Sequence, residues 1–174
     1  MVGETEDVQW LMARQIPRLR RYALSLTGDQ EAADDLVQDC LERAVGKRHQ
    51  WKRLGSIRSW LFRILYNVFL NQRVHRDRAR RHVGMDEIPL AMSEPARQEM
   101  ELACADIGSA MQKLPPEQRA AIALIALEEL TYDEAADVLQ IPIGTLRSRL
   151  FRGREKLREL YVGERHYPPL RRVK

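Results

Sequence analysis

Apolar residues recur every three to four positions over most of the chain, which is the spacing of one face of an α-helix. In the N-terminal half this spacing predicts helices over residues 5–27, 29–46 and 57–81, with Pro17 expected to kink or divide the first. No long alternating run of β-branched residues interrupts the pattern. The sequence therefore predicts an all-α protein.

The helical spacing is lost between residues 83 and 99, where a glycine, two prolines and several acids occur together, and it resumes soon after. Such a stretch is typical of a flexible linker between domains. We therefore expect two small helical domains, at residues 1–82 and 101–162. A flexible linker at 83–100 would join them, and a basic tail at 163–174 would follow.

The second domain has the pattern of a helix-turn-helix. Residues 120–130 are very apolar and are expected to form a buried scaffold helix. The next helix begins with a capping box, in which the Thr131 hydroxyl and the Glu134 carboxylate each satisfy a free backbone amide. Pro142 is expected to end that helix, and an arginine-rich helix follows from residue 143. This order of elements presents the second helix to the major groove of DNA.

Two helices carry side chains that suit nucleic acid. In the arginine-rich helix, Glu155 is the only acid between Ile143 and Arg158, so a merely solvated face explains its charge poorly. Its candidate DNA-binding residues are Arg147, Ser148, Arg149, Phe151, Arg152 and Arg154. The helix of residues 57–81 combines arginines that suit phosphate with aromatics and amides that suit unstacked bases, although a solvated face is the alternative. Trp51, in the basic loop before this helix, is expected to be exposed. The candidates of this loop and helix are Trp51, Arg58, Trp60, Arg63, Asn67, Asn71, Arg73 and Arg76.

The helix of residues 29–46 has an acidic face opposite its apolar face. The acidic face consists of Glu31, Asp34, Asp35, Gln38, Asp39 and Glu42. Acids in a first turn stabilise the helix dipole, but these are more numerous than the dipole requires. The residues alone leave two explanations open, a solvated face and a docking face for a basic protein surface.

The composition narrows the possible chemistry. Cys40 and Cys104 lie far apart in helical patterns, so buried or half-buried thiols are expected, with a redox switch as the alternative. The four histidines lack the spacing of metal ligands, so neither a metal nor a cofactor is expected. No nucleophile–base pair and no phosphate-binding loop is found, so we do not expect an enzyme.

The N-terminal sequence lacks the basic and apolar regions of a signal peptide. No apolar run approaches the ~20 residues that cross a bilayer, so no membrane segment is expected. A cytoplasmic location is the expectation. The net charge of +4 is too small to identify a partner by itself.

Three stretches together resemble the extracytoplasmic-function group of bacterial sigma factors, the minimal members of the sigma-70 family. AADDLVQDCLERA at residues 32–44 and SIRSWLFRILYNVFLNQRVHR at residues 56–76 are similar to two parts of sigma region 2. Residues 114–160, from LPPEQRAAIAL to REKLREL, are similar to region 4 almost throughout. The resemblance extends over residues 10–160, and the order and spacing of the three motifs are more specific than a lone helix-turn-helix.

The resemblance implies promoter-specific transcription initiation. Asp34, Asp35, Gln38 and Asp39 would bind the β′ clamp helices of core RNA polymerase, and the second domain would rest on the β flap. The helix of residues 57–81 would recognise and melt the −10 element of promoter DNA, and the arginine-rich helix would read the −35 element. The resemblance also implies an anti-sigma factor as a partner and a monomer when the chain is free.

The chain departs from the family pattern at two positions. Asn71 replaces a common aspartate, which puts the −10 contacts of that position in doubt. Gly153 replaces a common alanine in the arginine-rich helix, at an expected cost of at most ~1 kcal/mol in helix propensity.

Two other functions are weighed against promoter recognition. An ordinary helix-turn-helix regulator would explain residues 130–160, but it would explain neither the acidic helix nor the tryptophan-bearing basic helix. A sigma-like decoy that sequesters an anti-sigma factor would be expected to lose its DNA-reading side chains. This chain keeps the arginines at positions 147 and 152.

Overall fold

The computed structural model describes residues 2–51, 56–83 and 107–164, and within those ranges all regular secondary structure is helical. This confirms the all-α prediction of two helical domains. The expected linker at 83–100 and the basic tail lie almost wholly outside the described residues.

The first predicted helix is divided in two. α1 covers Val2–Ala13 and α2 covers Ile16–Thr27, with Pro17 in the first turn of α2. Proline fits there because the first-turn amides of a helix have no intrahelical acceptor. Gly28 ends α2 with a φ of 74°, a left-handed conformation that glycine adopts without strain.

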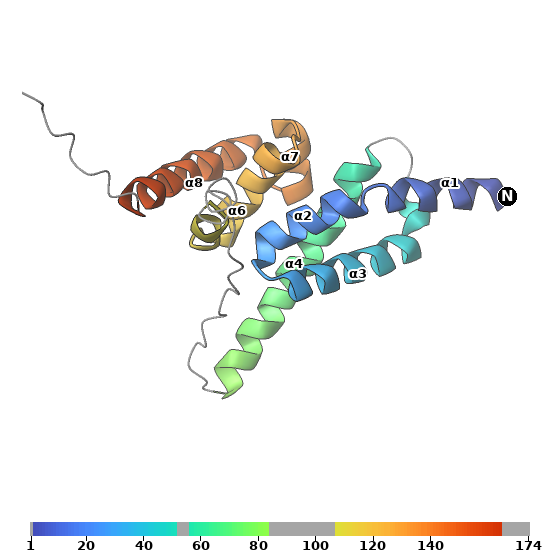
Figure 1. Cartoon of the computed structure of the whole chain (residues 1–174). Helices are drawn as coiled ribbons and strands as arrows, with labels where there is room; N and C mark the ends of the chain where they lie inside the picture. Colours follow the sequence, from blue (N-terminus) through green and yellow to red (C-terminus); the bar gives the residue numbers. More distant parts are fainter. Residues whose placement is uncertain (1, 52–55, 84–106, 165–174) are drawn as a thin grey trace, which may run out of the picture.

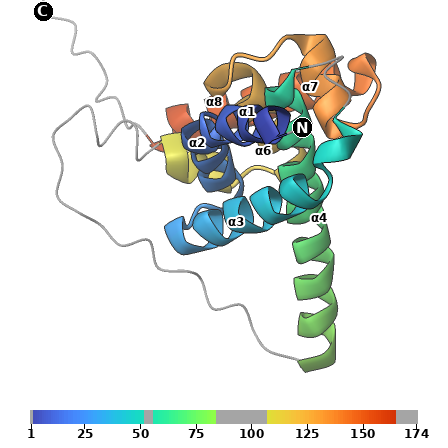
Figure 2. The same cartoon turned by 90° about the vertical axis from the view of Figure 1, so that its right-hand side faces the viewer.

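α3 and α4 complete the N-terminal domain. α3 covers Gln30–Gly46, and the Asp29 side chain caps it by accepting a hydrogen bond from the Ala32 amide at 2.8 Å. A short 3₁₀ turn at Arg48–Gln50 follows, and then α4 covers Ile57–Val83. α4 is the long helix of the fold, and its C-terminal part extends beyond the other helices (Figures 1 and 2).

The C-terminal domain is built from short helices around one long helix. Residues 107–112 are helical, α6 covers Pro116–Ile122, and a π-helical turn, η2, covers Ala123–Leu127. α7 covers Tyr132–Leu139 and α8 covers Ile143–Glu164. The predicted scaffold helix therefore exists, but it changes to a π-helical turn before ending.

The turn between α7 and α8 forms differently from the prediction. The capping box is confirmed, because Thr131 Oγ1 accepts from the Glu134 amide and Glu134 Oε2 accepts from the Thr131 amide. α7 does not end at Pro142. It ends at Leu139 because Gln140 turns left-handed, with a φ of 53°. The Pro142 carbonyl instead accepts the first hydrogen bonds of α8, from Thr145 and Leu146.

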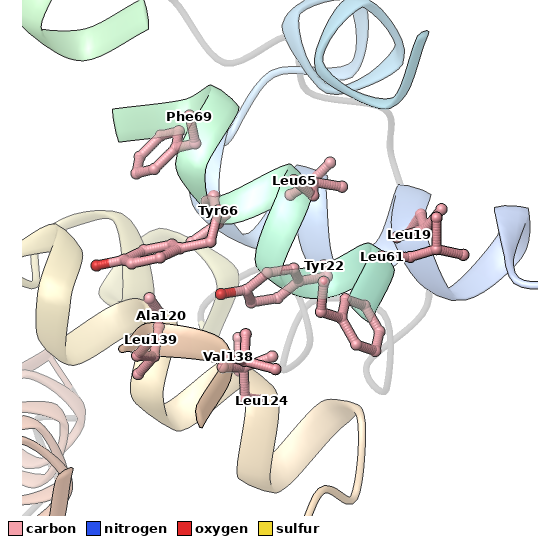
Figure 3. Packing of buried hydrophobic residues seen from close by; sticks show 14 of the residues in the cluster. Leu19, Tyr22, Leu61, Leu65, Tyr66, Phe69, Ala120, Leu124, Val138 and Leu139 are labelled. Atoms are coloured by element: carbon pink, nitrogen blue, oxygen red, sulfur yellow. The ribbon is translucent and has the colours of Figure 1, made fainter. Parts of the chain in front are cut away.

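The two domains share one hydrophobic core. α4 contacts α1, α2 and α3 within its own domain and α7 of the C-terminal domain, while α2 contacts α6 and η2. Figure 3 shows Tyr22 and Tyr66 lying over Ala120, Val138 and Leu139 of the other domain. The domains are thus packed together across an interdomain interface, formed by α2 and α4 on one side and by α6, η2 and α7 on the other.

Candidate nucleic-acid interface

The exposed face of α8 is the first candidate surface. Leu146 and Leu150 are buried and fix α8 to the C-terminal core. The side chains that point away from them are exposed, and these are Arg147, Ser148, Phe151, Arg152 and Arg154. Five of the six residues predicted on this helix therefore share one solvent-facing surface.

Phe151 stands at the centre of this face, and 68% of it is exposed. A hollow of about 280 Å³ lies beside it, lined by Tyr132, Leu150 and Arg154 among others. A second hollow is lined by Phe151 together with Arg147, Ser148 and Arg152. An exposed aromatic ring among guanidinium groups can contact an apolar base edge or sugar while the charges bind phosphates.

Arg149 does not lie on that face. It is half-buried, and its guanidinium group lies near the phenol of Tyr66 of α4 across the interdomain interface. Burial raises the pKa of the Tyr66 phenol, and the nearby charge of Arg149 partly offsets the rise. Arg149 cannot be told apart from its neighbours by sequence alone, because its partner lies in the other domain.

Three arginines of α4 also face the C-terminal domain. Arg58 lies 3.9 Å from the Glu134 carboxylate, Arg63 forms an ion pair with Asp137, and Arg73 lies 3.4 Å from Glu117. All three guanidinium groups are half-buried. In this arrangement they bind carboxylates, and their predicted contact with DNA stays a prediction that requires the interface to open.

The other candidates of this region are spread over several environments. Trp51 and Trp60 are half-buried and pack against the core, so the expected exposure of Trp51 is wrong. Asn67 is half-buried, whereas Asn71 and Arg76 are exposed. Asn67 and Asn71 are one turn apart on α4, so they lie on the same side of that helix.

Two charged residues at the interface, Glu128 and Arg119, were not predicted from the sequence. Glu128 is fully buried at the end of η2, and its carboxylate pairs with Arg21 of α2 at 2.7 Å. This hydrogen bond raises the pKa of Arg21. An acid directly after the apolar run of residues 120–127 was the sequence signal, because a buried carboxylate needs a partner.

Arg119 of α6 anchors the other end of the interface. Its guanidinium donates to the Leu26 carbonyl at 3.0 Å and to the side-chain oxygen of Gln112. Gln112 in turn donates to the Ser25 carbonyl at 3.0 Å. Burial lowers the pKa of Arg119, and the nearby charge of Arg73 lowers it further. The C-terminal domain is therefore tied to the end of α2 by hydrogen bonds to backbone.

The acidic face of α3 contains residues that bind neighbouring helices and residues that are exposed to solvent. Asp34 pairs with Arg20 at 3.0 Å, and Asp39 accepts a hydrogen bond from Gln72 of α4 at 2.9 Å. Asp35 and Gln38 are exposed. Of the four predicted docking residues, two therefore also hold α3 to its neighbours.

The described part of the chain contains no group of three or more His, Cys, Asp or Glu side chains that could hold a metal ion. None of its helices is both long and apolar enough to cross a membrane. Cys40 is buried, and burial raises the pKa of its thiol to about 12.

Family models match both domains. The model described as the Sigma2 domain of PhyR matches residues 12–66, and the model of sigma-70 region 4 matches residues 104–157. The second match includes the whole helix-turn-helix and the exposed face of α8.

Known sigma factors are similar over most of the chain. The ECF RNA polymerase sigma factor EcfG of Rhodopseudomonas palustris (strain TIE-1) is 34% identical over 83% of this chain and 80% of its own. SigM of Bacillus subtilis (strain 168) is 32% identical over 81% of this chain and 86% of its own.

A solved structure is similar over both domains. The sigma factor RpoE, in complex with the anti-sigma factor NepR from Bartonella quintana, is 30% identical and has a TM-score of 0.76. The similarity covers 92% of this chain and 99% of that chain. From the two matched regions and these relatives, the chain belongs to the extracytoplasmic-function sigma factors of RNA polymerase.

Proposed function

We propose that this sigma factor reads the −35 element of its promoters through the exposed face of α8. The observation that carries the proposal is the convergence of Arg147, Ser148, Phe151 and Arg152 on one solvent-facing surface. Arginine can donate two hydrogen bonds to guanine O6 and N7, and an aromatic ring can contact the methyl group of thymine. Arg154 is exposed and lines the same hollow as Arg147 and Phe151, and it suits a phosphate of the duplex backbone.

The −10 element is assigned to α4 and to the loop before it. Asn71 and Arg76 are exposed there, and Arg58, Arg63 and Arg73 supply charge once they leave their carboxylate partners. Amides and arginines suit unstacked bases and a separated backbone. Trp51, Trp60 and Asn67 are half-buried, so they would act at the edge of such a site while supporting the core.

Core RNA polymerase is proposed to bind the acidic face of α3 through its β′ clamp helices. Asp35 and Gln38 are exposed and would contact the polymerase directly. Asp34 and Asp39 would contribute charge while also holding Arg20 and Gln72. The C-terminal domain would rest on the β flap.

An anti-sigma factor is the proposed regulator. The similar RpoE structure contains a sigma factor bound to the anti-sigma factor NepR. We extend that kind of partner to this chain, and we expect it to bind a monomer.

The test is transcription by core polymerase with and without the chain, on a library of templates randomised around the −35 and −10 positions. Sequencing the 5′ ends of the transcripts should reveal start sites that depend on the chain. Arg147→Ala combined with Arg152→Ala should abolish them. Lys156→Ala, an exposed substitution elsewhere on α8, should preserve them. Start sites that are unchanged by the double substitution would refute the −35 assignment.

A sigma-like decoy is the second candidate, because the N-terminal match is to a model described as the Sigma2 domain of PhyR. A decoy would bind an anti-sigma factor and would yield no promoter-dependent transcript with core polymerase. The arginines exposed on α8 favour the sigma factor, since a decoy has no need of them.

A further inference from the structure

Among the described residues, every ion pair across the interdomain interface has the same polarity. In each pair the N-terminal domain contributes an arginine and the C-terminal domain contributes a carboxylate. The pairs are Arg21–Glu128, Arg58–Glu134, Arg63–Asp137 and Arg73–Glu117. The described part of the C-terminal domain thus presents an acidic surface, defined by these four carboxylates, to a basic surface of α2 and α4.

Three of the four arginines are residues assigned to promoter DNA, namely Arg58, Arg63 and Arg73. The guanidinium fork binds carboxylate and phosphate oxygens with the same geometry, so one arginine can satisfy either partner but not both at once. Arg58 also donates to the backbone carbonyl of Glu128 at 3.4 Å. The acidic surface therefore occupies the positions at which phosphates would lie.

Apolar contacts keep the acidic surface in place. Tyr22 and Tyr66 are buried against the C-terminal domain, which contributes Leu124 and Val138 on its side (Figure 3). Burial raises the pKa of Tyr22 well above its usual value, and the charges of Tyr66 and Glu128 add to the rise. The closed arrangement is thus a packed interface, and the ion pairs at its margin add charge complementarity to it.

We propose that the acidic surface of the C-terminal domain binds the basic surface of α4 in place of promoter DNA, so that the free chain masks its own −10 site. This proposal rests on the proposed function in one respect, the assignment of α4 to DNA. The apparent affinity of α4 for DNA is then its intrinsic affinity reduced by the fraction of open molecules. The exposed face of α8 is not masked in the same way.

The sharpest test is the removal of Arg21, for which we expect tighter binding to DNA although a positive charge is lost. Arg21 is not among the residues assigned to DNA, and Arg21→Gln leaves the fully buried Glu128 carboxylate without its partner. An unpaired buried carboxylate disfavours the closed state strongly. We expect the affinity for a fluorescent single-stranded oligonucleotide to rise about tenfold. This gain is smaller than the loss of a fully buried ion pair would give, because Arg21 is half exposed. The radius of gyration from solution X-ray scattering should increase.

The matched control is Arg18→Gln on the same helix. Arg18 forms no ion pair with the described residues of the C-terminal domain. Loss of a positive charge by itself weakens binding to DNA, because fewer counterions are released. The control should therefore bind the oligonucleotide slightly less well and should keep its radius of gyration.

A second variant opens the interface from the acidic side. Glu117→Gln with Asp137→Asn removes the partners of Arg73 and Arg63 at the surface, where neither substitution disturbs the core. The loss of these two partly exposed ion pairs should raise the affinity for the oligonucleotide by roughly 2- to 30-fold. The control is Asp133→Asn with Glu159→Gln, which has the same charge change in the same domain. Neither control residue pairs with the described part of the N-terminal domain.

The outcomes separate this proposal from the proposed function. Expansion together with tighter binding, in the interface variants and not in the controls, supports self-masking. Unchanged dimensions and affinity in both interface variants overturn it, and so does expansion without any gain in affinity. Chain-dependent transcription with core polymerase, measured on the same samples, tests the proposed function independently. Its failure would count against promoter recognition while the scattering result still decides whether the closed state exists.

Discussion

Gly153→Ala should destabilise the chain, although alanine is the better helix former. Gly153 is buried at the crossing of α8 with α6. A Cβ atom built at this position would lie 2.7 Å from Ile122 Cδ1 and 3.2 Å from Gln118 Cβ. The contact with Ile122 is too close for two carbon atoms, so the side chain or the helices must move.

The magnitude follows from two opposing effects. Replacing glycine by alanine inside a helix stabilises it by ~1 kcal/mol, and overpacking a core typically costs ~1–3 kcal/mol. Ile122 Cδ1 can shift because it ends a side chain, whereas Gln118 Cβ is fixed to the backbone of α6. We therefore expect a net loss of about 1 kcal/mol in the free energy of unfolding. For a chain of this length that loss lowers the melting temperature by roughly 2–4 °C.

The assay is thermal and urea unfolding followed by circular dichroism, with two comparison variants. Gly144→Ala lies in the same helix, but a Cβ atom there meets nothing within 4 Å, so it should leave stability unchanged or raise it. Ile122→Val removes the opposing methyl group and should recover part of the loss when combined with Gly153→Ala. If Gly153→Ala stabilises the chain as much as Gly144→Ala does, the close crossing of α6 and α8 is refuted.

Four further predictions concern single side chains. Thr131→Ala should lower the free energy of unfolding by about 1 kcal/mol, measured by urea titration, because it removes half of the capping box. A hydrogen bond from the Thr131 backbone amide lowers the pKa of Glu134 in the folded chain. The ionised Glu134 carboxylate therefore stabilises the fold fully above its unfolded pKa, and this contribution is lost as the pH falls through its lower folded pKa. Glu134→Gln should accordingly flatten the acid side of the stability–pH curve. Gln140→Gly should raise the melting temperature, since glycine adopts the left-handed φ of 53° without strain, at a gain of roughly 1 kcal/mol. Cys40, with its pKa raised to about 12, should resist iodoacetamide at neutral pH until urea is added, and rapid labelling of the native chain would revive the redox alternative.

The elements that the sequence predicted well are those whose signals are local. Asp29 caps α3 and Thr131 caps α7 with their own side chains, a few residues from the amides they satisfy. The exposed face of α8 follows from the spacing of Leu146 and Leu150, which determines which side chains point outward. In each case the partner that decides the structure lies within one or two helical turns.

The interdomain interface was not predicted, because its partners are far apart in the sequence. Arg63 and Asp137 are 74 residues apart, and Arg21 and Glu128 are 107 apart. An arginine-rich helix looks the same whether its guanidinium groups are to bind phosphates or carboxylates. Glu128 was the one local signal, since an acid directly after a buried apolar run requires a cationic partner.

The same ambiguity bears on the two proposed DNA-binding surfaces, which differ in the closed chain. α8 has its charged face in solvent, because the buried residues that hold it, Leu146 and Leu150, pack within the C-terminal domain. α4 packs against helices of its own domain and also against α7 of the C-terminal domain. Arginines at the margin of the contact with α7, such as Arg63, therefore need anionic partners in that domain. If α4 binds the −10 element and the exposed face of α8 binds the −35 element, then α8 can engage a promoter while the C-terminal domain still covers the arginines of α4. Recognition would then proceed from the duplex upstream element to the melted downstream element, and the free energy of opening the interface would contribute to promoter selection.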